Sequence, residues 1–167
     1  MSIWSIIETY PDKSWNWKTL SRRNDIPIHL IERHLDWPWH WASISHIAPW
    51  NVIATRPDLK WDWDMVSINP TITLEIVDAN PDCPWCWSRL SANSSVATMK
   101  SVLSSYNRPW DWTAFSMNES VTWADITAHP TLPWCWDGIS LNPNVTPYIV
   151  ANHMDKDWSW ELLSGKR

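Results

Sequence analysis

A tryptophan motif repeats along the whole chain and constrains the fold more than any other feature. The pattern Trp-x-Trp-x-x-[Leu/Ile/Val/Phe]-Ser occurs seven times, and successive copies start 22 to 25 residues apart. A fixed period of this size is typical of repeat arrays, in which each unit packs only on its neighbours. Fourteen of the 18 tryptophans lie in these pairs, and we expect them to form the structural core: Trp15, Trp17, Trp39, Trp41, Trp61, Trp63, Trp85, Trp87, Trp110, Trp112, Trp134, Trp136, Trp158 and Trp160.

Length and charge narrow the class of protein further. The repeats fill residues 1–167 and predict one continuous array without a second domain. A net charge of −5 and scattered Lys and Arg argue against a phosphate-binding groove. No apolar run approaches the ~18 residues of a membrane span. The N-terminus lacks the basic start and long apolar core of a signal peptide, and three cysteines, an odd number, favour a reducing compartment.

Each repeat unit divides into two segments, which are clearest between Asn69 and Ser91. The first is predicted to begin at Asn69-Pro70, because Asn caps helix starts and Pro fits the first helical position. It runs to about Ala79, where Asn80-Pro81 ends it. The second segment runs from Asp82 through the two tryptophans to Ser91.

The residue three before each first tryptophan predicts where the second helix begins. Asp, Asn or Thr occupies this position in every copy, and each can accept hydrogen bonds from the free N–H groups of a first helical turn. The predicted N-caps are Asp12, Asp36, Asp58, Asp82, Asn107, Thr131 and Asp155. The residue eight before the first tryptophan, such as Val77, is β-branched in every copy, as a core position would be.

Apolar spacing after the tryptophan pair favours a helix over a strand. The third residue past the second tryptophan, such as Leu90, is apolar in every copy, whereas the second residue past it shows no pattern. The resulting wide apolar arc suits a helix packed between neighbours. We therefore predict an all-α fold, an α-solenoid of about seven 24-residue helix-turn-helix repeats, with helices of roughly 8 and 10 residues that are marginal in isolation. A leucine-rich-repeat-like α/β solenoid is the alternative, but Leu20 and Ile44 stand where that repeat needs Asn.

The repeat frame N-P-x-I-T-x-x-I-V-x-x-N-P-D-x-P-W-x-W-x-x-L-S resembles a Trp-rich tandem repeat of uncharacterised proteins of giant DNA viruses. The resemblance covers essentially the whole chain and is closest in the copies that start at Asn69 and Asn142. The copy between Ser45 and Trp61 departs from it by being two residues short. The resemblance implies a viral protein in an intracellular setting, either host cytoplasm or virion, and it adds nothing about catalysis.

Two groups of residues could bind a metal or react as thiols, and repeat position favours a structural role for both. Cys83 and Cys86 form a C-x-x-C pair, but Cys86, like Cys135, fills the variable middle of Trp-x-Trp. Histidines recur at positions 29, 34, 40 and 46, yet His34 has counterparts in His129 and His153 at the expected end of the first helix. We therefore predict no metal and no cofactor.

The recurrent serine of the motif is not a candidate nucleophile, because seven equivalent copies do not make a catalytic site. We expect its hydroxyl to bond a backbone carbonyl or to cap the next helix. The copies are Ser21, Ser45, Ser67, Ser91, Ser116, Ser140 and Ser164.

Four tryptophans lie outside the motif and could stack on unpaired bases: Trp4, Trp37, Trp50 and Trp123. Trp37 and Trp50 are the two that we expect to be exposed. With two glycines in the chain, a Gly-rich phosphate loop is excluded.

The sequence thus predicts a non-enzymatic repeat scaffold for protein–protein interaction. One alternative is a virion or assembly component that self-associates through uncapped repeat ends, because the chain starts near Ile3 and stops near Ser164 in mid-repeat. Single-stranded nucleic-acid binding is a second and disfavoured alternative.

Overall fold

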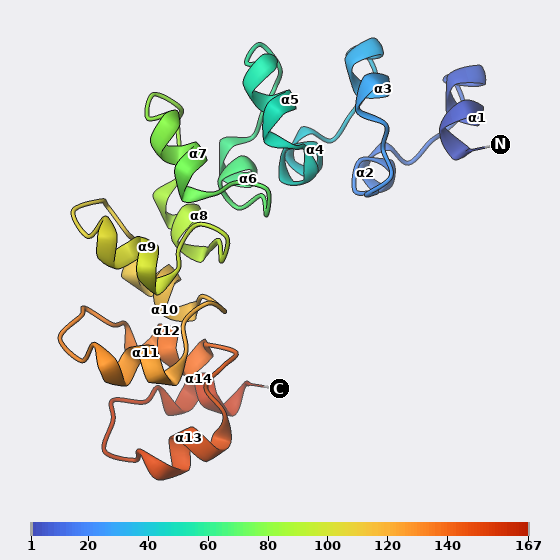
Figure 1. The fold of residues 1–167 in the computed structure, drawn as a ribbon. Helices are drawn as coiled ribbons and strands as arrows, with labels where there is room; N and C mark the ends of the chain where they lie inside the picture. Colours follow the sequence, from blue (N-terminus) through green and yellow to red (C-terminus); the bar gives the residue numbers. More distant parts are fainter. Residues whose placement is uncertain (1, 167) are drawn as a thin grey trace. The chain divides into compact units, whose positions relative to one another are not determined.

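The chain folds into short helices joined by loops (Figure 1). The computed structural model describes residues 2–166, and within that range it contains fourteen helices and no strand. This confirms the all-α, solenoid-like repeat, and the leucine-rich-repeat-like alternative is not favoured. The first helices of the repeats are α1 (Ile3–Thr9), α3 (Ile28–Arg33), α5 (Trp50–Thr55), α7 (Leu74–Ala79), α9 (Met99–Ser104), α11 (Trp123–Ala128) and α13 (Pro147–Asn152). The second helices are α2 (Trp17–Leu20), α4 (Trp41–Ile47), α6 (Trp63–Ser67), α8 (Trp87–Ala92), α10 (Trp112–Met117), α12 (Trp136–Leu141) and α14 (Trp160–Ser164).

The helices cluster into two compact units, unit 1 (Met1–Thr71) and unit 2 (Ile72–Arg167). In unit 1, Figure 1 shows α1, α3 and α5 in one row and α2, α4 and α6 in a second row. In unit 2, α10 packs against both α8 and α12, and α12 packs against α14. The boundary between the units falls inside the repeat frame, so the single array over residues 1–167 stays a prediction.

The apolar positions predicted from periodicity form the core of each unit. The β-branched residue eight before the first tryptophan is buried in six copies: Ile7, Ile31, Ile53, Val77, Val102 and Ile126. The residue three past the second tryptophan is also buried in six: Leu20, Ile44, Val66, Leu90, Phe115 and Ile139. The seventh members, Val150 and Leu163, are half-buried and belong to the last two helices.

The predicted N-caps of the second helices were wrong. Each second helix begins at the second tryptophan, and its N-cap is the residue between the two tryptophans. In four of these helices, α2, α4, α6 and α10, that residue's side chain accepts the N–H three residues on, as when Asp62 accepts from Met65. The observed caps are Asn16, His40, Asp62, Cys86, Asp111, Cys135 and Ser159.

The residues predicted as caps lie instead in the turn between the two helices of a repeat. The carbonyl that ends the first helix accepts the N–H three residues later, as when His129 accepts from Leu132 at 3.2 Å. This bond defines a β-turn, and Asp, Asn and Pro favour turns for reasons that overlap with capping. The misassigned residues are Asp12, Asp36, Asp58, Asp82, Asn107, Thr131 and Asp155. Both helices of a repeat are therefore shorter than predicted, at 4 to 7 residues.

The first helix of the repeat that starts at Asn69 also begins later than predicted. Helix α7 starts at Leu74 after Thr73, and not at Asn69-Pro70. Asn69 is fully buried, and its side-chain oxygen accepts the N–H of Thr71 at 2.9 Å, which closes a local turn ahead of the helix. The prediction of Asn69 as a helix N-cap was therefore wrong, because its side chain bonds the loop ahead of the helix.

The first tryptophan of every motif closes the turn that precedes it. Its indole N–H donates to the carbonyl five residues earlier, which is the carbonyl of the residue that ends the first helix. The bond occurs in all seven copies at 2.7 to 3.0 Å, from Trp15, Trp39, Trp61, Trp85, Trp110, Trp134 and Trp158. These rings are buried or half-buried, as the core prediction requires.

The second tryptophan of a motif packs against the first tryptophan of the next repeat. Within the units the two rings meet edge to face, with centroids 5.1 to 5.6 Å apart and interplanar angles of 81° to 89°: Trp17–Trp39, Trp41–Trp61, Trp87–Trp110, Trp112–Trp134 and Trp136–Trp158. Such a pair adds about 0.5–1.5 kcal/mol beyond its burial. Second tryptophans are half-buried, and Trp160 is 51% exposed, so its assignment to the core was wrong.

The motif serine bonds a backbone carbonyl, as expected, and it also joins successive repeats through a second buried hydrogen bond. Ser91 donates to the Trp87 carbonyl at 2.7 Å and accepts the N–H of Asp111, the N-cap of the next second helix, at 2.9 Å. Four other motif serines accept the backbone N–H of the next repeat's N-cap in the same way: Ser21 from His40, Ser45 from Asp62, Ser116 from Cys135 and Ser140 from Ser159. Six of the seven serines are fully buried.

Replacing Ser91 with alanine should destabilise unit 2, because it strands the N–H of Asp111 and leaves the Trp87 carbonyl with one fewer donor. We expect a loss of about 1–3 kcal/mol in the free energy of unfolding, measured by urea titration. Ser164→Ala is the matched control, because exposed Ser164 makes the same bond to its own helix, at 2.7 Å to Trp160, with no bond to a further repeat. Equal losses in the two variants would show that the inter-repeat bond contributes nothing.

Candidate functional site: a groove in unit 1

The loops that connect one repeat to the next are nearly constant in length except at one place. Helix α5 begins five residues after the motif serine, Ser45, whereas α3 and α11 begin seven residues after theirs. The short loop is Ala48-Pro49, which follows directly on α4. The two-residue shortening seen in the sequence therefore removes most of one connecting loop from unit 1.

The regular loops of unit 2 bind each other edge to edge. Asn142 is fully buried, and its side-chain amide donates to the carbonyls of Ser116, Asn118 and Val121 at 2.9 to 3.3 Å. Lys166 makes the equivalent bonds one repeat later, to the carbonyls of Ser140, Asn142 and Val145. In unit 1, Asn69 donates to Ser45 and Ala48. This asparagine series was missed in the sequence, where Asn two residues after the motif serine was the available signal.

A groove of about 1050 Å³ lies in unit 1 beside the shortened loop. One wall comes from the loop before α3 and from α3 itself, the floor from α4, and the other wall from the segment around Asn69. Its apolar lining includes Ile26, Ile31, Ile44 and Ile47. The groove therefore occupies the side of unit 1 on which a regular loop between α4 and α5 would stack.

The ionisable side chains that line this groove are Arg22, His40 and His46, and its lining includes no Asp or Glu. The Nδ1 atom of His46 is buried and has no hydrogen-bond partner among residues 2–166. Asp25, the closest carboxylate along the chain, is held by the guanidinium of Arg23 at 2.7 and 2.8 Å, which lowers the pKa of Asp25. The groove therefore presents potential positive charge in a chain whose net charge is −5.

The cysteines are free thiols in half-buried positions. Cys86 and Cys135 are N-caps of α8 and α12, which fits the structural role that their repeat position indicated. Burial, with a smaller effect from the charge of Asp82, raises the pKa of the Cys83 thiol. A reactive thiol needs a lowered pKa, so this environment disfavours thiolate chemistry at Cys83.

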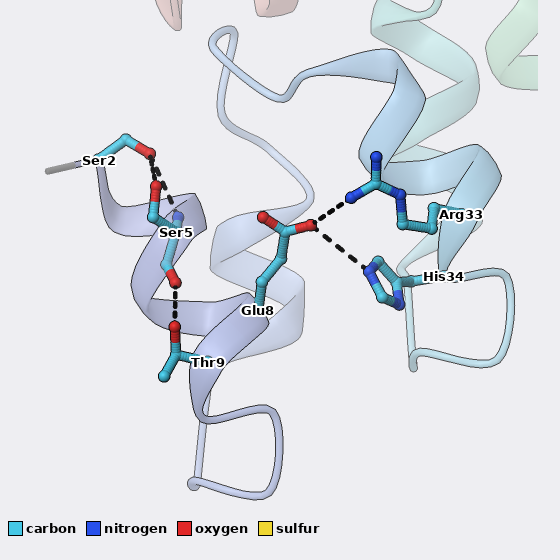
Figure 2. A network of polar contacts seen from close by, with 6 residues as sticks. All are labelled: Ser2, Ser5, Glu8, Thr9, Arg33 and His34. Atoms are coloured by element: carbon cyan, nitrogen blue, oxygen red, sulfur yellow. Dashed lines mark hydrogen bonds and ion pairs between the residues drawn. The ribbon is translucent and has the colours of Figure 1, made fainter.

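The histidines are distributed over separate helix ends. His34, His129 and His153 follow the last residues of α3, α11 and α13, where the sequence placed them. Figure 2 shows Glu8 of α1 between Arg33 and His34, at 3.0 and 3.6 Å from their nitrogens. Within residues 2–166 no group of three or more His, Cys, Asp or Glu side chains is placed to hold a metal ion.

Three of the four tryptophans outside the motif, Trp4, Trp37 and Trp123, make ring contacts within their units. Trp4 is buried, although it was predicted as a spare ring. Trp37 is half-buried and stacks on His34 with centroids 4.0 Å apart, while Trp123 stacks on Trp158 at 5.6 Å. Trp50 is also half-buried. The expected exposure of Trp37 and Trp50 was wrong, because both side chains are half-buried.

No protein-family model, curated protein or solved structure matches this chain. In the described part of the chain, no helix combines the length and the apolar character that crossing a membrane requires.

The raised pKa of Cys83 predicts a shifted pH profile for its alkylation. In a chain with Cys86→Ser and Cys135→Ser, the rate of reaction of folded Cys83 with iodoacetamide should rise at higher pH than in the urea-unfolded chain. The pH midpoint is the measurement, because restricted access slows the reaction without moving the midpoint. A midpoint below that of the unfolded chain would restore the redox interpretation of the C-x-x-C pair.

Proposed function

We propose that this chain is a non-enzymatic repeat scaffold that binds an extended segment of a partner protein in the unit 1 groove. The observation that carries the proposal is the groove itself, an apolar concavity of about 1050 Å³ where the repeat frame is shortened. Binding sites combine apolar walls with a few polar groups that fix orientation. The groove has both, with isoleucines along its walls and Arg22, Asn24 and His46 among them.

An extended segment suits this groove better than a helix does. In unit 2 the space between neighbouring loops is filled by a loop, and its contacts are hydrogen bonds from amide and hydroxyl groups to backbone carbonyls. A segment of similar conformation can use the same backbone edge, which is how strands and loops recognise added chains in other proteins. The resemblance to Trp-rich viral repeats makes host and virion proteins the partners to examine first.

Self-association is a second candidate function, and the surface of α13 and α14 favours it. Trp160 is 51%, Met154 63% and Tyr148 78% exposed. A cavity of about 590 Å³ beside them is lined by Val150 and Leu163 among others. Because other second tryptophans meet a first tryptophan edge to face, we propose that a second copy supplies the ring that covers Trp160, through a head-to-tail contact.

Panning a library of displayed random peptides on the full chain tests the scaffold proposal. We expect selected peptides to bind the wild-type chain and to lose binding to Ala42→Trp, because Ala42 lines the groove and the larger ring fills it. Thr113→Trp is the matched control, since Thr113 is exposed at the corresponding position of α10. Peptides that bind all three chains equally, or no enriched peptides, would contradict the proposal.

Light scattering after size exclusion tests self-association over about a hundredfold range of concentration. We expect the mass of the wild-type chain to rise above 19.6 kDa with concentration. The mass of Trp160→Glu should remain at 19.6 kDa, because a buried carboxylate opposes the contact. Tyr106→Glu serves as the control, since Tyr106 is 53% exposed elsewhere in unit 2. A wild-type mass of one chain at every concentration would reject this candidate.

A further inference from the structure

We infer that the unit 1 groove is selective for a segment that carries an acidic residue, then Ser, Thr or Asn, then Val or Ile. This inference rests on the proposed scaffold function and names the chemistry of the partner. Glu-Ser-Val is one such segment, and it occurs in the chain itself at Glu119, Ser120 and Val121.

The template for recognition is the way in which this segment binds the preceding loop in unit 2. The carboxylate of Glu119 accepts a hydrogen bond from the hydroxyl of Ser94 at 2.9 Å. The hydroxyl of Ser120 donates to the carbonyl of Ala97 at 2.6 Å. Val121 is fully buried beside them. Three consecutive side chains thus make one charged, one polar and one apolar contact with the edge of the preceding loop.

The first loop of unit 1 offers the same kinds of partner to the groove. Asn24 lies three residues after its motif serine, as Ser94 does, and its amide can donate to a carboxylate. Ile26 lies five residues after its serine, as Val121 does, and Val121 uses its carbonyl to accept Asn144 at 2.9 Å. Both Asn24 and Ile26 line the groove, and among residues 2–166 the carbonyl of Ile26 has no donor.

The apolar contact follows from the residue that the short loop lacks. Regular loops bury a β-branched side chain five residues after the motif serine: Ile72, Val96, Val121 and Val145, each at most 2% exposed. Five residues after Ser45 the chain has already reached Trp50, the first residue of α5. No residue of the short loop fills the space between Ile26 and Ile47, so an incoming Val or Ile can occupy it.

The acidic residue is favoured by charge. Arg22 stands two residues before Asn24 on the same wall, and none of the residues that line the groove is acidic. An incoming carboxylate gains a charge-assisted hydrogen bond there, whereas an incoming lysine meets Arg22. The preceding Asn118 contact, a bond to the Ser91 carbonyl, is not part of the motif that we infer.

The partner must be another protein, because the chain's own segments of this kind are already used. Val96, Val121 and Val145 are buried in their own repeats, and Glu119 is bonded to Ser94. A second folded copy therefore has no free segment to offer.

Fluorescence anisotropy with a labelled peptide copying residues 117–122, Met-Asn-Glu-Ser-Val-Thr, tests the inference on the full chain. We expect saturable binding that weakens about tenfold when the peptide carries Glu119→Lys or Val121→Gly. Binding should weaken about as much when the exposed Asn24 of the chain is changed by Asn24→Ala. Ala42→Trp should abolish binding, and Thr113→Trp should leave it unchanged.

The outcomes separate this inference from the function on which it rests. If panning enriches peptides that Ala42→Trp excludes, but they lack the acidic and β-branched residues, the scaffold stands and the inference fails. If the hexapeptide binds equally with Glu119→Lys, or equally to Asn24→Ala, the inference also fails. Enrichment of acid-[Ser/Thr/Asn]-[Val/Ile] peptides together with the expected losses would support it.

Discussion

The bond from each first tryptophan to the end of the preceding helix is the constraint on which the rest of the structure depends. Helices of 4 to 7 residues do not persist alone in water. The indole N–H and the turn N–H both reach the same carbonyl, as Trp134 and Leu132 do at His129, and this fixes the angle between the two helices of a repeat. The ring that makes the bond also meets the preceding repeat's second tryptophan edge to face, so one side chain orders both the turn and the stack.

Buried polar groups set the register in which repeats stack, while apolar burial supplies most of the stability. A serine hydroxyl accepts the N–H of the next repeat's N-cap, and an asparagine amide donates to loop carbonyls of the repeat before it. In another register these buried donors would lose their partners, and each unpaired buried donor costs about 1–3 kcal/mol. The hydrogen bonds therefore favour a single register. Lys166 shows how general the carbonyl site is: burial lowers the pKa of its ammonium group, yet three carbonyl oxygens hold it in the place of the amide.

The sequence predicted the helical class and the core, because both follow from spacing. Val77 and Leu90 lie at helical intervals around the tryptophan pair, and periodicity identifies such faces without knowledge of helix ends. Periodicity did not predict where the helices begin and end. Asp82 was ambiguous at this point, because Asp stabilises both helix N-caps and turns. Asn69 had the same ambiguity, and its role depends on carbonyls of Ser45 and Ala48 that lie more than twenty residues away in the sequence.

The groove shows why a departure from the repeat tells more about function than the repeat does. The sequence revealed that the copy after Ser45 is short, but a deletion in a loop has two possible results: neighbouring elements close up, or space remains. In unit 1 space remains beside the short loop, because the same serine, asparagine and tryptophan contacts that build the regular repeats hold α4 and the segment around Asn69 in place. These contacts thereby keep one loop-sized position open. If a partner segment occupies that position, as we propose, it needs the chemistry of the loop that the other repeats supply, and this links the proposed specificity to the repeat sequence itself.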